Sequence, residues 1–454
     1  MSIIIPANSA VAGGYDVENS CRFDGTAAYL NRTQGTSTNL TKFAWSGWIK
    51  RSKLGADQTV TMNYASASNY GYFYFRSGDD IRIFDRGAGG DTVAISDMLF
   101  RDTSAWYHIA LIIDTTQATD TNRLKLYVNG ILQGLNGVTY PAENAALGWK
   151  VANTSNTFLM RTNSADGYVG GYLAEVAYVD GTANAITDFG EFDEDSGIWK
   201  PIDVSGLTFG NEGYYLDFKD SANLGNDVTG GTDFTENSLA AIDQTTDTCT
   251  NNFATGNILS PYANRTITDG SLTITSTTTQ WTNICSTIGV SSGKWWIELK
   301  HTAGSYGGLG IVSPFPQTEN NVIGDFSAPV IQQIGYVAAS GDKKINNSTS
   351  SYGSTWVGTG DIVNMSLNLD DNELKFYKNG TVQDSGTAIA ISSGYTYFVG
   401  TSNYNSSGSS FNFGNPAFSI SSGNADANGY GNFEYAPPAG FLALCTKNLS
   451  GELS

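Results

Sequence analysis

The sequence predicts an all-β protein with very little helix, organised as two β-sandwiches in tandem. Three observations lead to this prediction: the composition, the spacing of the apolar residues and one internal repeat. The chain has 454 residues, of which 52 are Gly, 12% are aromatic and 15% are charged. Ordinary soluble domains hold about 7% Gly and about 25% charged residues. This chain is therefore rich in turn formers and in the aromatic residues that favour strands.

Short strand-like segments recur along the whole chain. Residues 43–50, 106–113 and 124–128 are rich in aromatic or β-branched side chains, and turn-forming residues bound them. No stretch keeps the i, i+3, i+4, i+7 spacing of an amphipathic helix. We therefore expect at most one or two helical turns, for instance near residues 183–187.

One internal repeat relates the two halves. Residues 122–130 have the sequence NRLKLYVNG, and residues 372–380 have the sequence NELKFYKNG. The Asn-Gly pair that ends each segment accepts positive φ at both central positions of a type I′ hairpin turn. The repeat predicts two β domains of one broad architecture, at residues 1–219 and 260–454.

A polar, Gly-rich segment at residues 220–259 separates the two predicted domains. Such a composition is typical of a loop or linker. Three apolar residues within it, Phe234, Leu239 and Phe253, should pack against folded structure. We therefore expect an ordered linker.

The charge balance and the scarcity of reactive side chains disfavour several classes of protein. The chain has 24 Lys and Arg against 43 Asp and Glu, a formal net charge of −19, so nucleic acid is not expected as a partner. Four scattered Cys give neither a disulfide framework nor a zinc-ligand spacing. Only two His are present, which leaves little room for a catalytic triad or a His metal centre.

The sequence gives no indication of membrane insertion or of export by a cleaved signal. No run of about 18 apolar residues is present. The first 14 residues lack a basic start, and their apolar run stops at Pro6. We therefore expect no signal peptide.

Five segments of the first half carry a resemblance to a known family. In this order, they resemble the strands of the laminin-G-like group of concanavalin A-type jelly rolls: residues 21–30, 43–50, 106–113, 124–130 and 171–179. The resemblance implies a jelly-roll β-sandwich in which the closing strand lies beside the opening one.

Six segments of the second half resemble the strands of a SPRY domain: residues 293–299, 308–312, 361–370, 374–380, 395–400 and 411–414. SPRY domains are also two-sheet sandwiches of the concanavalin A kind. The two resemblances together imply two concanavalin A-like jelly-roll β-sandwiches in one chain.

Residues 214–225, 243–255 and 433–444 give the whole chain a further resemblance, to virion proteins of tailed phages. This implies a tail fibre, appendage or decoration protein, made in the host cytoplasm and released by lysis. The implied partners are other virion proteins and a host-surface glycan or protein. A homo-oligomer such as a trimer fits a fibre, although no heptad run or β-helix repeat supports a shaft.

One acidic segment was weighed as a catalytic motif. Glycosidases need two facing carboxylates, about 5–5.5 Å apart in retaining enzymes. In residues 191–197, Glu191, Asp193 and Asp195 alternate, but the final Glu found in one glycosidase family of this fold is absent. A solvated acidic turn and a calcium site are the other interpretations. We therefore expect no enzyme activity and assign no catalytic residue.

The resemblance to laminin-G-like domains also implies that calcium could bind near one rim, through Asp or Asn side chains. The candidate ligands are Asp79, Asp80, Asp114 and Asp120. Asp114 follows a predicted strand, where a turn-forming Asp is the ordinary explanation. No cofactor other than calcium is expected.

Aromatic residues in loops are the best candidates for ligand binding, because rings offer a large and rigid contact area. These candidates are Tyr306, Trp356 and Tyr404. Adjacent Trp295 and Trp296 lie in a predicted strand and must face opposite sides. One of them therefore points away from its own core and is free to pack against the neighbouring domain.

Two functions of different classes follow. In the first, the loops of the sandwiches bind a host-surface glycan or protein without chemistry. In the second, the protein is purely structural and decorates or joins virion components through flat sandwich faces. A glycan hydrolase is the third and least supported interpretation.

Overall fold

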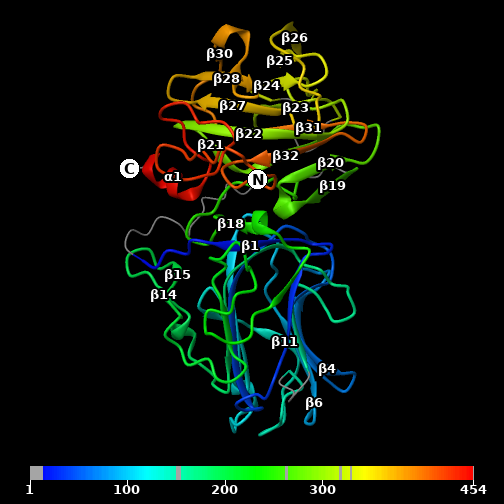
Figure 1. Ribbon diagram of the computed structural model, residues 1–454, viewed down its shortest axis with the longest axis vertical. Helices are drawn as coiled ribbons and strands as arrows, with labels where there is room; N and C mark the ends of the chain where they lie inside the picture. The colour runs from blue at the N-terminus through cyan, green and yellow to red at the C-terminus, as the bar shows by residue number, and fades with distance from the viewer. Residues whose placement is uncertain (1–13, 150–154, 261–263, 316–319, 328–329, 453–454) are drawn as a thin grey trace. The chain divides into compact units, whose positions relative to one another are not determined.

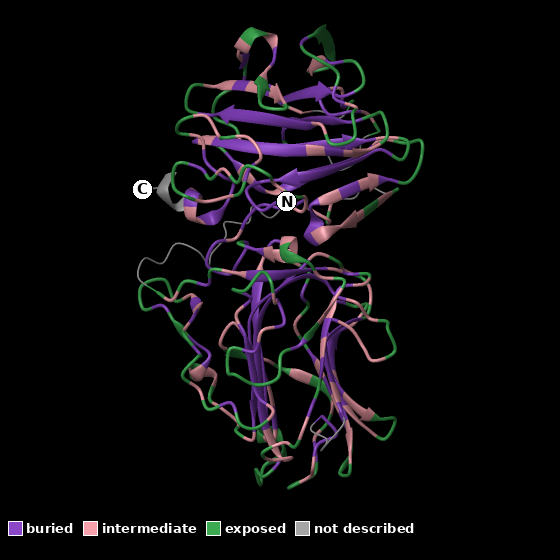
Figure 2. Cartoon of the chain, in the orientation of Figure 1, coloured by how far each residue is buried: buried purple, intermediate pink, exposed green. Residues whose placement is uncertain are grey.

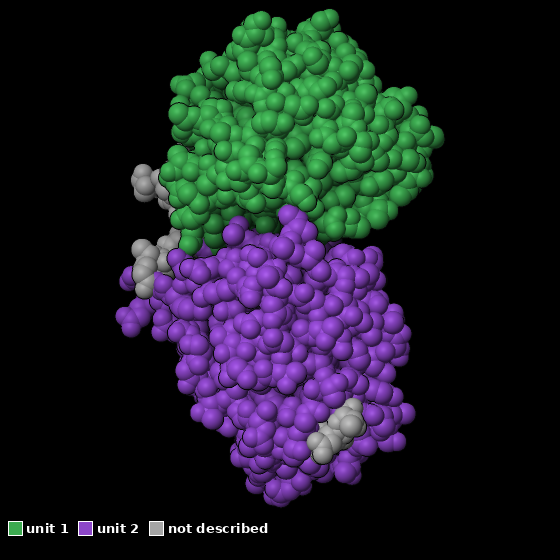
Figure 3. Space-filling view, in the orientation of Figure 1, with its two compact units in different colours: residues 1–6, 251–454 green, residues 7–250 purple. Residues whose placement is uncertain are grey.

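The computed structural model describes residues 14–149, 155–260, 264–315, 320–327 and 330–452. The first 13 residues, on which the expectation about a signal peptide depends, lie outside these ranges. The described residues divide into two compact units, with the boundary between Thr250 and Asn251 (Figure 3). In chain order, the unit that ends at Thr250 (purple in Figure 3) is called the first unit below, and the unit that begins at Asn251 (green) is called the second unit.

The first unit consists of two eight-stranded antiparallel sheets, the A sheet and the B sheet, and a small hairpin (Figure 1). The A sheet has the strand order β10 (Ile131–Leu132), β9 (Leu124–Val128), β8 (Trp106–Asp114), β3 (Lys42–Arg51), β13 (Gly170–Asp180), β1 (Ser20–Asp24) and β18 (Gln244–Thr245), with β16 (Tyr214–Leu216) also paired to β13. The B sheet has the order β11 (Leu135–Thr139), β7 (Gly90–Ser96), β6 (Ile81–Gly87), β5 (Asn69–Phe75), β4 (Gln58–Ser66), β12 (Asn156–Leu159), β2 (Tyr29–Thr33) and β17 (Thr235–Asn237). The hairpin pairs β14 (Gly190–Phe192) with β15 (Trp199–Pro201).

The second unit also has two antiparallel sheets, the C sheet and the D sheet. The C sheet has the order β19 (Arg265–Thr268), β20 (Thr273–Ser276), β32 (Gly408–Asn412), β22 (Lys294–Ala303), β27 (Ile362–Asn368), β28 (Glu373–Lys378) and β29 (Thr381–Val382), with β30 (Ile389–Ala390) also paired to β28. The D sheet has the order β21 (Thr282–Val290), β31 (Tyr397–Asn403), β23 (Gly308–Ser313), β24 (Gln332–Val337), β25 (Asp342–Ile345) and β26 (Ser348–Ser351).

Helix is rare in the described ranges. The α-helix α1 spans Thr446–Glu452. The 3-10 helices have three residues each: η1 (Asp120–Asn122), η2 (Ile186–Asp188), η3 (Ala241–Asp243), η4 (Asp269–Ser271) and η5 (Asp384–Gly386). The all-β prediction is confirmed, and η2 falls where a helical turn was expected.

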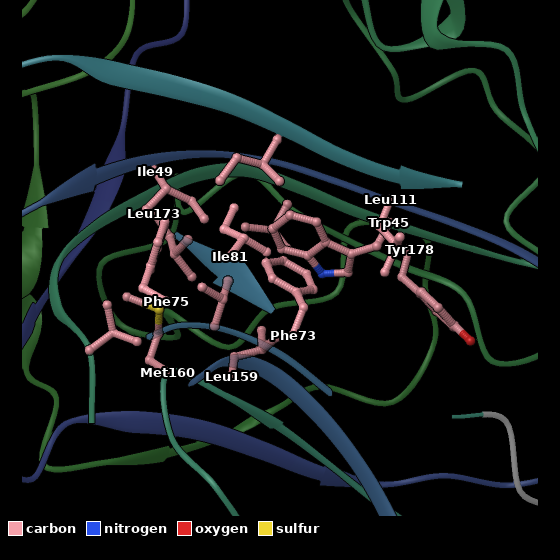
Figure 4. Close-up of a cluster of buried hydrophobic side chains, with 14 of the residues drawn as sticks. Trp45, Ile49, Phe73, Phe75, Ile81, Leu111, Leu159, Met160, Leu173 and Tyr178 are labelled. Atoms are coloured by element: carbon pink, nitrogen blue, oxygen red, sulfur yellow. The ribbon is translucent and has the colours of Figure 1, made fainter. Parts of the chain in front are cut away.

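The core of the first unit lies between its sheets, because alternate residues of each strand point to one face. Trp45 and Leu111 from the A sheet meet Phe73, Phe75 and Ile81 from the B sheet, and all five are fully buried (Figure 4). The same alternation gives the second unit its own core, and buried residues follow the strands in both units (Figure 2). The closing strand β13 pairs with the opening strand β1, as the jelly-roll resemblance implies.

The predicted linker is divided by the structure, and most of it belongs to the first unit. Phe234 is buried in the first core and Leu239 packs against it, while Phe253 is buried in the second unit. Asp247 forms an ion pair with buried Lys50 of β3, with 2.7 Å between Oδ2 and Nζ. The composition indicated a loop, but it could not show that buried ion pairs and short strands would fix that loop to the A sheet and the B sheet.

The two Trp residues of β22 face opposite sides, as predicted. Trp295 lies in the second core, whereas Trp296 is buried with Phe433 and Cys445 of the C-terminal segment. Glu298, two residues further along the same face, accepts hydrogen bonds from the backbone amides of Glu434 (3.0 Å) and Tyr435 (2.9 Å). The C-terminal segment of the same unit therefore covers the outer side of Trp296.

The repeated Asn-Gly pairs form matching turns in the two units. Asn129 and Gly130 have φ of 47° and 76°, and Asn379 and Gly380 have φ of 48° and 75°. Each Asn side chain also accepts a hydrogen bond of 2.8 Å from the neighbouring strand, from the amide of His108 or Ile362 respectively. This hydrogen bond explains why Asn occupies the position, in addition to the tolerance of Asn for positive φ.

These turns give a first testable prediction. A Cβ on Gly380 would lie 2.4 Å from the ring of Tyr435, whereas a Cβ on Gly394, which also has positive φ, would meet nothing within 4 Å. We expect Gly380→Ala to lower the free energy of unfolding of the second unit by about 2–4 kcal/mol, because strain and overlap add. Gly394→Ala should cost only about 1–2 kcal/mol, from strain alone. Denaturant unfolding measures both, and equal losses would contradict the contact with Tyr435.

Candidate functional site

Three aromatic side chains gather at one end of the D sheet and form the candidate site. The ring centroids of Tyr306 and Tyr404 are 5.1 Å apart, those of Trp281 and Tyr404 5.2 Å, and those of Trp281 and Tyr306 6.5 Å. Tyr306 is 38% exposed, and the other two rings are partly exposed. We call these three residues the ring cluster.

The sheet register explains why residues so far apart in sequence meet here. Trp281 immediately precedes β21, Tyr404 immediately follows β31, and Tyr306 lies two residues before β23. These three strands are neighbours, because Thr282 pairs with Asn403 and Gly308 pairs with Ser402. Antiparallel pairing thus brings the start of two strands and the end of the third to the same end of the sheet.

Backbone hydrogen bonds hold the loops that carry the rings. The buried hydroxyl of Ser407 accepts from the amide of Tyr306 at 3.0 Å, and Asn405 donates its amide to the carbonyl of Thr278 at 3.0 Å. The amide of Trp281 donates to Asn320 Oδ1 at 2.9 Å. The rings therefore sit on tied loops, which lowers the entropy cost of using them as a contact surface.

The exposed residues next to Trp281 and Tyr404 in sequence are polar and uncharged. Exposed neighbours in sequence include Thr278, Thr279 and Gln280 before Trp281, and Asn405 and Ser406 after Tyr404. Rings provide apolar contact, and hydroxyl and amide groups provide hydrogen bonds. This combination suits a ligand with both C–H faces and hydroxyl groups.

The structure corrects one of the three predicted binding residues and adds one. Trp356 is 0% exposed and packs in the second core beside Tyr336, with ring centroids 6.0 Å apart. Position in a polar sequence segment therefore did not make it a surface residue. Trp281 was not predicted, although it follows the polar run Thr277–Gln280 and could have been selected by the same reasoning.

Each of the four predicted calcium ligands already accepts hydrogen bonds or forms an ion pair within the protein. Asp79 forms an ion pair with Arg51 at 3.2 Å, and Asp80 forms one with Arg76 at 2.5 Å. Hydrogen bonds from Thr116 and Gln117 to Asp114 lower the pKa of that carboxyl group. Asp120 is the first residue of η1, and its Oδ1 accepts a hydrogen bond from the amide of Thr121.

Cations are the wrong neighbours for a calcium ligand, since they already neutralise the carboxylates. Within the ranges that the structure describes, no group of three or more acidic, His or Cys residues is placed to hold a metal ion. The calcium site that the resemblance implied stays a prediction, and two of its four candidate ligands, Asp79 and Asp80, are paired with arginine side chains.

The acidic segment around Glu191 forms the hairpin of β14 and β15. Lys200 Nζ lies 3.2 Å from Glu191 Oε1 and 3.4 Å from Asp193 Oδ2. Asp193 also accepts hydrogen bonds from the amide and the hydroxyl of Ser196, which lower its pKa. One lysine thus neutralises two of the alternating carboxylates, an arrangement that suits a turn and not a pair of glycosidase residues.

Two further buried groups, His108 and Glu175, are of the residue types that act as catalytic acids or bases. Buried His108 contacts Ser46 Oγ through Nε2 at 2.8 Å, but its Nδ1 has no hydrogen-bond partner among the described residues, and burial lowers its pKa to about 3. Glu175 is buried at a bulge of β13 with φ of 51°, and burial raises its pKa to about 7. Tyr215 and Tyr15 donate hydrogen bonds to its Oε2, at 2.5 and 3.3 Å.

A raised pKa at a strained position can mark a catalytic acid. Glu175, however, does not line the hollow of about 490 Å³ that contains Tyr215, Phe209 and Val228. The His108 pair has no carboxylate to orient it, as a triad requires. Both groups are buried, and Tyr215 lies between Glu175 and the hollow.

Comparisons with known proteins support the fold of the first unit. Residues 24–185 match the laminin-G-type family model described as "Concanavalin A-like lectin/glucanases superfamily". The first unit therefore carries a laminin-G-like domain of the concanavalin A type, a lectin-like β-sandwich. No curated protein matches the chain.

Solved structures with similarity to the chain include SPRY domains and a pentraxin. The SPRY domain of human HERC1 is 14% identical, covers 33% of this chain and 93% of its own, and has a TM-score of 0.28. Another human SPRY domain has 14% identity, 33% and 95% coverage and a TM-score of 0.26. The heptameric SAP-like pentraxin from Limulus polyphemus has 13% identity, 45% and 94% coverage and a TM-score of 0.31. None of these similarities bears on ligand or activity.

The burial of Trp356 gives a second prediction. Trp356→Ala should lower the free energy of unfolding of the second unit by about 3–5 kcal/mol, because it empties a large volume in the core. Ligand binding per folded molecule should stay unchanged. Thermal unfolding measures the stability, and titration of the folded fraction with ligand measures the binding. Weaker binding at unchanged stability would show that Trp356 contacts the ligand.

Glu175 gives a third prediction, on pH dependence. The folded state holds this proton with a pKa of about 7, above the ordinary value of about 4.3, so the stabilising contribution is present at low pH and is lost as pH rises toward 7. Glu175→Gln keeps an acceptor for Tyr215 and removes the buried charge. We expect it to raise the melting temperature of the first unit at pH 8 by about 2–6 °C.

The same variant should leave the melting temperature at pH 4 unchanged. Some pH dependence should remain in it, because burial also raises the pKa of Asp85 in the same unit to about 7. A melting temperature at pH 8 that falls in Glu175→Gln would contradict the assignment.

Proposed function

We propose that this protein is a non-enzymatic binding protein that recognises a surface glycan through the ring cluster of its second unit. The proposal is carried by one observation: Trp281, Tyr306 and Tyr404 come from three separate sequence segments and meet at one end of the D sheet. The lectin-like domain in the first unit is compatible with a binding role.

The ring cluster supports a glycan more than a nucleic acid or an apolar ligand. Sugar rings present C–H faces that pack on aromatic rings, and their hydroxyl groups bond to amide and hydroxyl side chains such as Asn405 and Thr279. The net charge of −19 repels phosphate backbones. A host-surface protein is the second ligand class, and the experiment below separates the two.

The non-enzymatic part of the proposal is supported by the state of the candidate carboxylates. Glu191 and Asp193 are paired with Lys200, and Glu175 lies buried below the surface. Turnover of any bound glycan, lost on Glu191→Gln, would overturn this part.

The proposed biological setting is the virion of a tailed phage, as a fibre, appendage or decoration component. It is supported by the resemblance of residues 214–225, 243–255 and 433–444 to such virion proteins. Within the described residues no helix is long and apolar enough to cross a membrane. Immunogold labelling of particles with an antibody to the chain tests the setting, and particles without label would overturn it.

The ring cluster gives a fourth prediction. Tyr306→Ala and Tyr404→Ala should each weaken binding to an array of bacterial surface glycans at least about tenfold, the loss expected for one well-packed ring contact. Tyr395→Ala is the matched control, because Tyr395 is 39% exposed in the same unit and precedes β31, whereas Tyr404 follows it. The control should bind as the unaltered chain does.

Three outcomes would contradict the glycan proposal. Binding to a deglycosylated host-surface protein that needs Tyr404 would show a protein ligand. Equal losses in all three variants would show that the ring cluster is not the site. Absence of any binding, with the chain buried between other components in particles, would favour the purely structural function.

A further inference from the structure

The first unit carries a second aromatic surface, on the outer face of its B sheet. Alternation along β5 sends Phe73 and Phe75 into the core and leaves Tyr70 and Tyr72 on the opposite face, where both are partly exposed. The outer face of the A sheet, by contrast, is covered by residues such as Phe189 and Trp199 from the β13–β16 connection.

Cross-strand pairing builds this surface into two rows. In one row Tyr64 of β4, Tyr70 of β5 and Arg86 of β6 lie opposite one another. In the other row Met62, Tyr72 and Phe84 do the same. The ring centroids of Tyr70 and Tyr72 are 6.0 Å apart, and those of Tyr64 and Tyr70 are 6.1 Å apart.

Arg86 lies against two of the rings, and its charge is balanced by Asp91. Its guanidinium group lies 5.5 Å from the ring centroids of both Tyr70 and Phe84. Nε and Nη2 donate to the two carboxylate oxygens of Asp91, at 2.8 and 2.7 Å. The fixed ion pair orders the rings before any ligand arrives and leaves little net charge for an acidic ligand.

The rings line an open groove of about 410 Å³. The opposite wall is the loop that follows β12, with Thr162, Asn163, Ser164 and Asp166. This loop is closed on itself, because the amide of Thr162 donates to the carbonyl of Asp166 at 3.0 Å. The volume lies within the range of about 300–1,000 Å³ that is common for ligand sites.

The polar groups that line the groove indicate which kind of ligand it would bind. In the part of the chain that the structure describes, the hydroxyls of Tyr64, Tyr70 and Tyr72 make no hydrogen bond to protein. Three phenol hydroxyls, the amide of Asn163 and the carboxylate of Asp166, whose Oδ1 already accepts from the Thr162 hydroxyl, together offer donors and acceptors beside the rings. An apolar ligand would leave these groups without partners, at a cost.

We propose that this groove is a second ligand site, independent of the ring cluster, and that it binds a neutral oligosaccharide. The sugar faces pack on Tyr70 and Tyr72, and the sugar hydroxyls bond to the phenol groups and to the loop at residues 162–166. The chain then has one glycan site in each unit, and the groove does not depend on the function proposed for the second unit.

The experiment uses the full chain with Tyr306→Ala and Tyr404→Ala already introduced, so that only the groove remains to be measured. A panel of neutral hexasaccharides, the cello-, malto-, laminari-, manno- and chito-hexaoses, is titrated by calorimetry. At least one member should bind, and Tyr72→Ala should weaken it at least about tenfold. The matched control is Tyr127→Ala, a partly buried tyrosine on β9 of the A sheet, which should leave binding unchanged.

Tyr72→Phe keeps the ring and removes one hydroxyl, so it preserves the fold even if Tyr72→Ala does not. We expect it to weaken binding about threefold to tenfold, the effect of one lost hydrogen bond. Four results would overturn the proposal: no hexasaccharide bound, binding that Tyr72→Ala and Tyr72→Phe both leave unchanged, an equal loss in Tyr127→Ala, or binding of acidic oligosaccharides or peptides only. Because the background lacks Tyr306 and Tyr404, failure here leaves the proposal for the ring cluster untouched.

Discussion

The structure depends on one constraint: a strand has two faces, and a two-sheet sandwich buries only one of them. In β5 the constraint separates Phe73 and Phe75, in the core, from Tyr70 and Tyr72, on the outer face. The aromatic content therefore exceeds what the two cores require, and each outward-facing ring needs a cover, a partner or a ligand. The sheets of this protein differ in whether the chain covers their outer face or leaves it open.

Two of the outer faces are covered by the chain itself. The C sheet is covered by the C-terminal segment, which buries Trp296 and donates two backbone amides to Glu298. Asn364 and Asn412, on the neighbouring strands of the C sheet, donate two further hydrogen bonds to Glu298. The A sheet is covered by the β13–β16 connection, with Trp199 in a buried cluster beside Trp48. Tyr64, Tyr70 and Tyr72, on the outer face of the B sheet, have no such cover in the described residues, which is why their groove remains open.

The ends of strands supply the other exposed rings. Rings on an outer face are ordered by the sheet register, whereas Tyr306 and Tyr404 are ordered by loops tied to Ser407 and Thr278. Both arrangements fix aromatic groups before a ligand binds. The neighbours of the ring cluster in sequence are uncharged and polar, whereas the groove also contains Arg86 and Asp166. Two modest sites on one chain would gain from avidity on a surface that repeats the ligand.

The sequence by itself determined the fold class, the two-sandwich organisation and the Asn-Gly turns, because residue alternation and turn chemistry are local properties. It selected Tyr306 and Tyr404 because both lie in polar, Gly-rich or Ser-rich segments. The polar run before Trp281 made that residue an equal candidate, but the sequence could not show that its ring meets the other two, and it placed Trp356 on the surface. Burial and proximity depend on strand register over more than a hundred residues. Only the tertiary structure decided which aromatic faces the chain covers and which carboxylates its own cations neutralise, because both depend on contacts between segments that sequence order does not connect.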